Sequence, residues 1–171
     1  ALSLSWPIID VRSPGEFQKG HIPTAVNIPL FSNEERAQVG TAYKQQSPEA
    51  AKELGLKFVT PKLNDFITDS LQVAPNKKVI VHCWRGGMRS RSFARHLAEH
   101  GFQQAKIISG GYKAFRNHVL ESFAIPAHLL VLGGYTGSGK TYILQELKAM
   151  GEQIIDLEGL ANHRGSDFGG L

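Results

Sequence analysis

Short apolar runs alternate with helix-like stretches along this chain of 171 residues, and this alternation restricts the fold more than any other feature. The apolar runs have the length of strands and lie at 7–11, 25–28, 78–82 and 106–108. The stretches between them carry helix start signals, helical periodicity or a closing glycine, and they lie at 33–44, 62–73, 89–100 and 112–121, with a further helix from 48 that Gly55 interrupts. Strands that alternate with helices predict an α/β fold in which helices flank a parallel sheet.

A change of pattern at 122–126 predicts a domain boundary. Residues 1–122 have the size of an ordinary domain. Residues 123–171 predict only the start of a second one, with a strand at 128–132, a glycine-rich loop, a helix at 140–150 and a strand at 153–156. Because so short a piece cannot bury a core of its own, we expect the chain to be truncated within this second domain.

The composition excludes several classes of protein. Hydrophobic residues make up 42% and charged residues 20%, which is typical of a folded, water-soluble chain rather than a disordered or fibrous one. No apolar run has the ~18 residues that would span a membrane. A single cysteine, Cys83, cannot build a disulfide framework, so the expected location is the reducing cytoplasm. The net charge of +4 is compatible with a nucleic-acid or phosphorylated partner.

Cys83 lies between a buried strand and a helix start. In that position, successive backbone N–H groups and the helix dipole form a cradle for an anion. We expect these amides, together with the charges of Arg85 and Arg89, to lower the pKa of the thiol. A thiolate of this kind attacks a phosphoryl group, or it accepts and carries sulfur or selenium. The expected anion-binding loop consists of Trp84, Arg85, Gly86, Gly87, Met88 and Arg89.

A second glycine-rich loop fits the pattern G-x-x-x-x-G-K-[ST]. It follows an apolar run and opens a helix, which is the context expected for a phosphate-binding loop. Lys140 would meet the terminal phosphates and the Thr141 hydroxyl would bind Mg²⁺. The ligand stays open, because no second acidic motif for the metal is identified. The expected phosphate-binding residues are Gly134, Gly137, Gly139, Lys140 and Thr141.

No other motif predicts a metal centre. His96 and His100 lie four residues apart on a predicted helix, but no third ligand is evident. We therefore predict no protein-bound metal and no tightly bound cofactor, with Mg²⁺ at the second loop as the one candidate.

The segments 10–12 and 16–29 resemble the upstream signature of the rhodanese family, and Cys83 then falls at the position of the catalytic cysteine of that family. The loop differs, because Arg89 is the sixth residue after Cys83 and the loop is one residue longer than in the sulfurtransferases. The sequence from His82 to Ser90 also matches the cysteine-phosphatase signature H-C-x-x-G-x-x-R-S. The dual-specificity cell-cycle phosphatases resemble rhodaneses in fold, and their loop is similarly enlarged.

Nearly the whole chain resembles the tRNA 2-selenouridine synthase family. The segments that carry this resemblance lie at 35–44, 83–90, 110–114 and 156–166, and they accompany the pairing of a rhodanese-like domain with a phosphate-binding loop. The resemblance implies replacement of sulfur by selenium in wobble 2-thiouridine of tRNA, with selenophosphate and geranyl diphosphate as co-substrates and S-geranylation as the first step. Cys83 would carry selenium as a selenopersulfide. The charges of Arg85 and Arg89 would hold selenophosphate, and the second loop would hold a diphosphate or part of the tRNA backbone.

Three hypotheses therefore remain, and the first is favoured. The chain is a tRNA-modifying selenium transferase, for which tRNA, selenophosphate and a selenophosphate-producing enzyme are the candidate partners and a membrane is not. Alternatively, it is a cysteine phosphatase or a generic rhodanese sulfurtransferase, although no general-acid Asp is identified for the phosphatase. The third hypothesis is a binding module without catalysis, which would be favoured had Cys83 been replaced.

Overall fold

The computed structural model describes residues 6–126 and 128–162. The chain divides into two compact units, Ala1–Ile125 and Pro126–Leu171. In the part of the chain that the structure describes, no helix is both long and apolar enough to cross a membrane.

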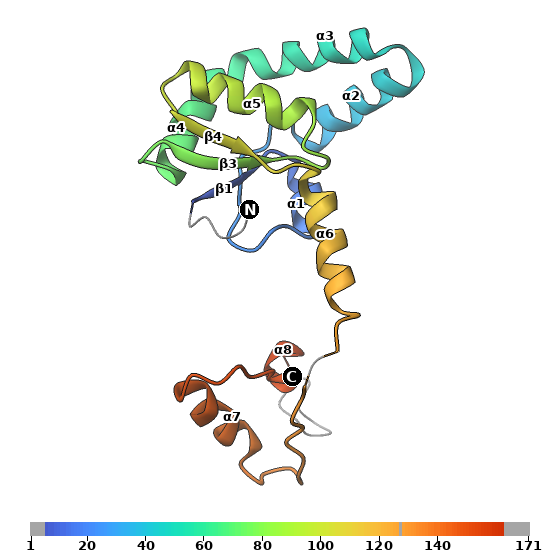
Figure 1. The fold of residues 1–171 in the computed structure, drawn as a ribbon. Coiled ribbons are helices and arrows are strands. Elements are labelled where there is room, and N and C mark those ends of the chain that lie inside the picture. Colours follow the sequence, from blue (N-terminus) through green and yellow to red (C-terminus); the bar gives the residue numbers. More distant parts are fainter. Residues whose placement is uncertain (1–5, 127, 163–171) are drawn as a thin grey trace. The chain divides into compact units, whose positions relative to one another are not determined.

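A four-stranded parallel sheet with the order β2-β1-β3-β4 forms the centre of the first unit (Figure 1). The strands are β1 (Ile8–Asp10), β2 (Val26–Asn27), β3 (Lys78–His82) and β4 (Gln104–Ile107). Ile9 is aligned with Val26 on one side and with Val81 on the other, which makes β1 and β3 the inner strands. The parallel α/β fold expected from the sequence is confirmed.

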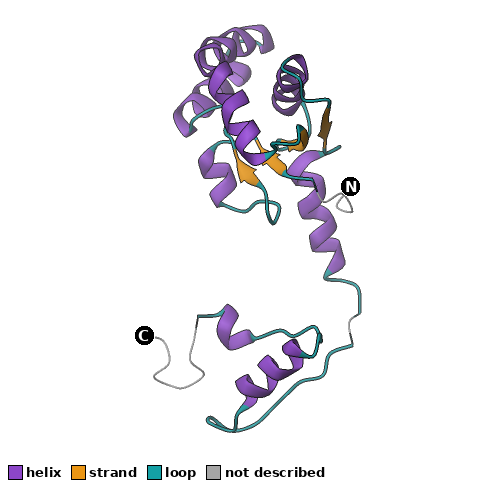
Figure 2. Cartoon of the chain, turned by 90° about the vertical axis from the view of Figure 1, so that its left-hand side faces the viewer, coloured by secondary structure: helices purple, strands orange, loops and turns teal. Residues whose placement is uncertain are grey.

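Helices cover both faces of the sheet (Figure 2). Alternate residues of β3 enter different cores, because successive side chains of a strand point to opposite faces. Val79 and Val81 pack in one core with residues of α4 and α5, whereas Ile80 packs in the other with residues of α1 and α6. The helices of this unit are α1 (Pro14–Gln18), α2 (Asn33–Gln45), α3 (Pro48–Val59), α4 (Leu63–Val73), α5 (Met88–Glu99) and α6 (Gly111–Ser122), and a 3₁₀ turn at Thr60–Lys62 joins α3 to α4.

The predicted interruption at Gly55 is wrong, because α3 continues through it. A Cβ at Gly55 would lie 3.2 Å from the ring of Phe31, closer than nearly all real contacts. The glycine therefore marks a close approach of α3 to a buried aromatic ring, not the end of a helix.

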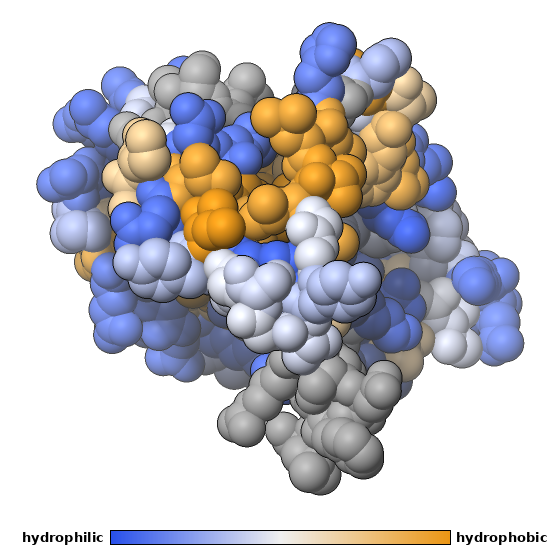
Figure 3. All heavy atoms as spheres, turned by 90° about the horizontal axis from the view of Figure 1, so that it is seen from below, coloured by the Kyte–Doolittle hydropathy of each residue, from blue (hydrophilic) through white to orange (hydrophobic). Residues whose placement is uncertain are grey.

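The second unit contains the predicted helix but neither predicted strand. Its helices are α7 (Lys140–Ala149) and α8 (Leu157–Leu160), and no strand occurs among its described residues. A strand exists only when its backbone pairs with a neighbour, and the run 128–132 has no such neighbour here. Leu130 and Val131 are 104% and 91% exposed. Figure 3 shows apolar side chains gathered at the surface on the side that it views.

Candidate active site

Cys83 lies at the carboxyl end of β3, the inner strand that is followed by the loop 84–87 and then by α5. This edge of a parallel sheet is where α/β proteins commonly place their sites. The end of β1 lies beside it, since the Val11 amide donates a hydrogen bond to the His82 carbonyl at 3.0 Å. The sequence therefore brings the thiol, the loop and the segment 10–12 to one edge of the sheet.

The thiol of Cys83 is only 3% exposed, yet its surroundings favour the thiolate. Burial raises the pKa of Cys83, because a charged sulfur loses water. The Ser90 hydroxyl and the backbone amides of Ser90, Gly87 and Arg85 outweigh that effect, so that the pKa lies below its ordinary value. Hydrogen-bond donors around a buried sulfur raise the share of thiolate at a given pH.

Ser90 is the side chain that contacts the sulfur. Its Oγ lies 3.4 Å from Cys83 Sγ and 3.2 Å from the Gly87 carbonyl oxygen, to which it donates a hydrogen bond. The hydroxyl has one proton and two acceptors, so it can turn toward the sulfur when the thiol ionises. Ser90 ended the signature His82–Ser90 but was not among the predicted site residues.

The two arginines of the loop do not play the part that was expected of them toward the thiol. Arg89 Nη1 lies 2.9 Å from Glu16 Oε2, so its positive charge is already paired. Arg85 is exposed, and it acts on the sulfur through its backbone amide. The main effects that lower the pKa of Cys83 therefore come from Ser90 and the loop amides, not from the guanidinium groups.

Glu16 joins α1 to Arg89, just after the loop that follows Cys83, and sequence reasoning missed this contact. Its Oε2 also accepts from the Ser13 amide at 3.2 Å and lies 3.7 Å from Arg36 Nε. Burial raises the pKa of Glu16, but Arg89, Ser13 and Arg36 together hold it below its ordinary value. The available signal was the sequence Ser13–Glu16, which forms a capping box and so fixes the carboxylate at the start of α1.

His82 directly precedes Cys83 but is a core residue. Its side chain is fully buried, with Nε2 3.6 Å from Asp10 Oδ2 and Nδ1 3.4 Å from the Cys83 carbonyl. Burial is the main reason that the pKa of His82 lies below its ordinary value, and the nearby Arg12 acts in the same direction, whereas Asp10 opposes it. Arg12 in turn holds the Asp10 carboxylate with both Nε and Nη2.

The loop is held from outside by the first turn of α6. The Tyr112 amide donates to the Cys83 carbonyl and the Lys113 amide donates to the Trp84 carbonyl, both at 2.9 Å. Gly86 and Gly111 make this approach possible: a Cβ on Gly86 would overlap the Ile108 carbonyl, and a Cβ on Gly111 would overlap the Cys83 carbonyl. Both glycines have positive φ, 65° and 59°. The remaining loop side chains differ, since Trp84 is half-buried and Met88 is 66% exposed.

The second predicted site lies in the other unit, at the start of α7. Gly137 and Gly139 have φ of 78° and 81°, a conformation that glycine adopts without strain. Lys140 Nζ donates to the carbonyls of Gly134 and Tyr135, at 2.9 and 2.8 Å. The loop and the lysine thus lie together at a helix start.

Two acidic residues follow the second loop. The Thr141 hydroxyl lies 3.3 Å from Glu158 Oε2, a partner that sequence reasoning missed. Asp156, the last residue of the expected strand 153–156, caps α8 by accepting a hydrogen bond from the Gly159 amide at 3.0 Å. Of these two carboxylates, Glu158 is therefore the one that contacts the second glycine-rich loop, through Thr141.

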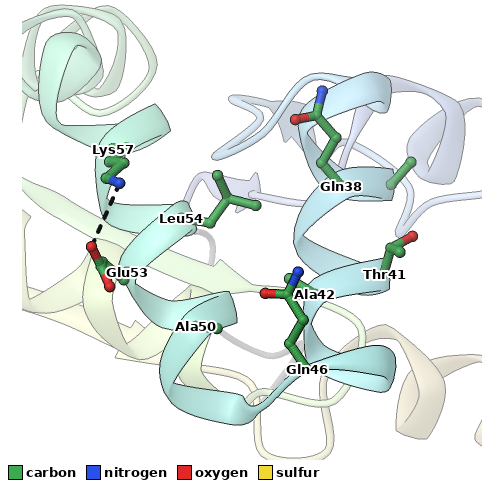
Figure 4. Close-up of a pocket in the computed structure, with 9 residues that line it drawn as sticks. Gln38, Thr41, Ala42, Gln46, Ala50, Glu53, Leu54 and Lys57 are labelled. Carbon is green, nitrogen blue, oxygen red and sulfur yellow. Dashed lines mark ion pairs between the residues drawn. The ribbon is translucent and has the colours of Figure 1, made fainter.

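Other candidate features lie outside both loops. His96 Nε2 is 3.0 Å from the Leu63 carbonyl, and no group of three metal-ligating side chains occurs among the described residues. A cavity of about 570 Å³ lies between α2 and α3, where Glu53 and Lys57 are 3.5 Å apart (Figure 4). None of the predicted site residues lines this cavity.

Comparison with family models divides the chain in the same order. Residues 2–118 match the rhodanese-like domain, and residues 127–171 match the AAA domain of tRNA 2-selenouridine synthase. Two curated relatives named tRNA 2-selenouridine synthase are similar over 95% of this chain: one from Bdellovibrio bacteriovorus at 44% identity and one from Serratia proteamaculans at 46%. The chain spans 44% of the length of each of these relatives.

A solved structure resembles the first unit. The N-terminal domain of a candidate ATP/GTP-binding protein from Clostridium difficile 630 is 41% identical, with a TM-score of 0.66. The match covers 70% of this chain and 94% of that one.

Proposed function

The chain belongs to the rhodanese-like domain family and carries the domain pairing of the tRNA 2-selenouridine synthases, and from this premise we propose that it takes part in replacing sulfur by selenium in wobble 2-thiouridine of tRNA. The observation that carries the proposal is the position of Cys83, a buried sulfur whose pKa is lowered by the Ser90 hydroxyl and by the backbone amides of Arg85, Gly87 and Ser90. Such a thiolate accepts a chalcogen atom and carries it, and the cradle around it suits an anionic donor.

The selenium donor is selenophosphate, and Cys83 is the acceptor. The thiolate attacks the selenium atom, so that an S–Se bond forms and the Se–P bond breaks. The electron pair of the broken bond leaves with phosphorus as phosphite, and no outside oxidant is needed. The Arg85, Gly87 and Ser90 amides stabilise the negative charge of the Cys83 thiolate before the attack.

Transfer to the nucleotide then follows S-geranylation of the base. The terminal selenium attacks C2 of the geranylated base and geranylthiolate leaves. An external thiol then cleaves the S–Se bond, so that selenium stays on the base and Cys83 is released as a mixed disulfide. A second molecule of thiol regenerates the Cys83 thiolate.

Intact-mass measurement after incubation with selenophosphate tests this role of Cys83. We expect the native protein to gain one selenium atom, a reductant to remove it, and Cys83→Ala to gain none. Phosphorus NMR of the same reaction should show phosphite. Phosphate without selenium uptake would contradict the proposal, because it would show hydrolysis of the donor instead of transfer.

A cysteine phosphatase is the second candidate, favoured by the signature from His82 to Ser90. Two carboxylates lie near the site, and both are engaged. Asp10 is buried against Arg12, and Glu16 is paired with Arg89 and has a lowered pKa, which keeps it ionised. Neither is suited to donate a proton to a leaving group at neutral pH. Hydrolysis of p-nitrophenyl phosphate by the native protein but not by Cys83→Ala would support this alternative.

The loop 134–141 is proposed to hold the diphosphate of geranyl diphosphate, with the tRNA backbone as the other candidate. Its glycines have the backbone conformations of a phosphate cradle, and Lys140 and Thr141 lie at the helix start. Mg²⁺ suits the Thr141 hydroxyl and the Glu158 carboxylate, since both supply oxygen. Geranyl diphosphate should therefore bind the native protein more tightly than Lys140→Ala in a calorimetric titration. Equal affinity would favour the tRNA backbone.

The proposed partners follow from this chemistry. They are tRNA as the substrate and an enzyme that supplies selenophosphate. The proposed location is the cytoplasm, where both partners occur. The single thiol agrees with a reducing compartment.

A further inference from the structure

We infer that Trp84, Arg85 and Lys113 form the contact that receives RNA at the Cys83 site, with the Trp84 ring stacked on an unpaired nucleobase and the two cations on neighbouring phosphates. This inference rests on the proposed function, because it names the surface that would bring the nucleotide to Cys83. The three residues come from the active loop and from the first turn of α6.

Trp84 is placed to act as a stacking platform. It follows Cys83 directly, and its carbonyl accepts the hydrogen bond from the Lys113 amide. Its half-buried ring lies against Tyr112, with centroids 5.7 Å apart. Tyr112 is itself fixed by the Arg12 guanidinium, which lies 3.9 Å from the centre of its ring. An aromatic ring that is held in this way, beside the reacting atom and partly open to solvent, suits an unpaired base of any sequence.

The charges beside Trp84 suit the phosphates of the same strand. Arg85 and Lys113 are exposed, and Arg116 is exposed farther along α6. In the part of the chain that the structure describes, no ion pair involves any of these three, whereas Arg36, Lys62 and Arg89 are paired with carboxylates. Exposed cations without protein partners are the groups that neutralise RNA phosphates and release counterions.

Backbone contacts hold the first turn of α6, which contains Lys113, against the loop that follows Cys83. A Cβ on Gly111 would overlap the Cys83 carbonyl and would lie 2.5 Å from the Gly86 amide nitrogen, so the turn before Lys113 is pressed against the active loop. The main chain of Lys113 therefore lies beside that of Trp84, to whose carbonyl its amide donates a hydrogen bond. A partner protein with an acidic surface would use the cations but would have no need of the aromatic ring, so RNA is the occupant that fits both.

The two tryptophans of the chain make a direct test possible. In Trp6→Phe, Trp84 is the remaining indole, and a synthetic anticodon stem-loop RNA should quench its fluorescence in a saturable and salt-dependent way. In the matched variant Trp84→Phe, Trp6 is the reporter, and RNA should leave its emission unchanged. Quenching of Trp6 but not of Trp84 would overturn the inference.

Affinity measurements separate the ring from the charges. Trp84→Ala should weaken RNA binding by about 5- to 150-fold, while Trp84→Phe, which keeps a ring, retains most of the affinity. Lys113→Ala should reduce the slope of log K against log salt by about one. Lys57→Ala removes the same charge from the exposed surface of α3 and should change neither value.

Failure of this RNA contact can be distinguished from failure of the proposed selenium transfer. If the native protein takes up no selenium but RNA binding depends on Trp84, the proposed chemistry fails and the RNA contact stands. If the native protein takes up selenium and Trp84→Ala binds RNA as tightly as native protein, the contact is overturned and the chemistry stands. Equal binding of an acidic peptide and of RNA would also overturn the assignment of a nucleobase to Trp84.

Discussion

The chain contains two glycine-rich loops that each follow an apolar run and open a helix, and only the first is part of a folded core. The run before Cys83 is β3, which pairs with β1 and β4 and buries its side chains on both faces. The run before Gly134 pairs with no strand among the described residues, and Leu130 and Val131 are exposed. The two loops share glycines, a preceding apolar run and a following helix, but they differ in what surrounds them.

This difference shows which structural features a motif specifies by itself and which ones require contacts with the rest of a domain. Both loops have glycines at positive φ, and both helices begin directly after them. At the first loop, the donors converge on a sulfur and a turn of α6 presses against the backbone. At the second loop, the amine of Lys140 turns back to carbonyls of its own loop. The conformation of the loop and the start of the helix are thus set by the local sequence. The pairing of the preceding strand and the arrangement of polar groups around the loop depend on residues far away in the chain.

We expect the largest effect on stability from a substitution that disrupts the contact between α6 and the first loop. In Gly111→Ala, the new methyl group would overlap the Cys83 carbonyl, and the residue has φ 59°. We expect a loss of about 2–5 kcal/mol in the free energy of unfolding, measured in urea by the emission of the two tryptophans. Gly87→Ala is the control in the same loop, because no atom lies within 4 Å of its Cβ and its φ is −95°. Equal stability of the two variants would show that α6 does not support the loop.

The comparison of the two loops also shows which structural elements and contacts can be predicted from the sequence. The bounds of β3, the starts of α5 and α7 and the closing glycine of α5 follow from local patterns, and the structure contains them. The pairing of Glu16 with Arg89 joins residues 73 positions apart, and no local pattern contains it. The helix α1 is not among the expected helices, because a helix of one turn with Pro and Gly at its start has few positions that show periodicity. The missing strands of the second unit have the same cause as the missed ion pair, namely dependence on a distant partner.

A smaller effect is expected from removing the hydroxyl beside the sulfur. Ser90→Ala deletes the side-chain donor that lowers the pKa of Cys83, so the pKa should rise while burial continues to act. Because the thiolate forms above the pKa, the rise of the iodoacetamide reaction rate with pH should move to higher pH. At neutral pH the rate should fall several-fold. Ser92→Ala, at an exposed position of α5, serves as the control. An unchanged pH profile in Ser90→Ala would mean that the loop amides alone hold the thiolate.

The smallest expected effect concerns the carboxylates beside the two loops. The pKa of Glu16 is held below its ordinary value in the folded protein. Its ion pairs therefore stabilise the fold fully when the pH is above the pKa of an ordinary Glu. This stabilisation is lost as the pH falls through the lower pKa of the folded state. Glu16→Gln should therefore lower stability at pH 7 by about 0.5–1 kcal/mol, because the pair is partly exposed, and the difference from native protein should shrink in acid. Glu158→Gln, beside the exposed second loop, should leave the unfolding of the first unit unchanged at either pH. A stability difference for Glu16→Gln that persists in acid would assign its effect to packing instead of charge, and the contrast between the two loops would then rest on their strands alone.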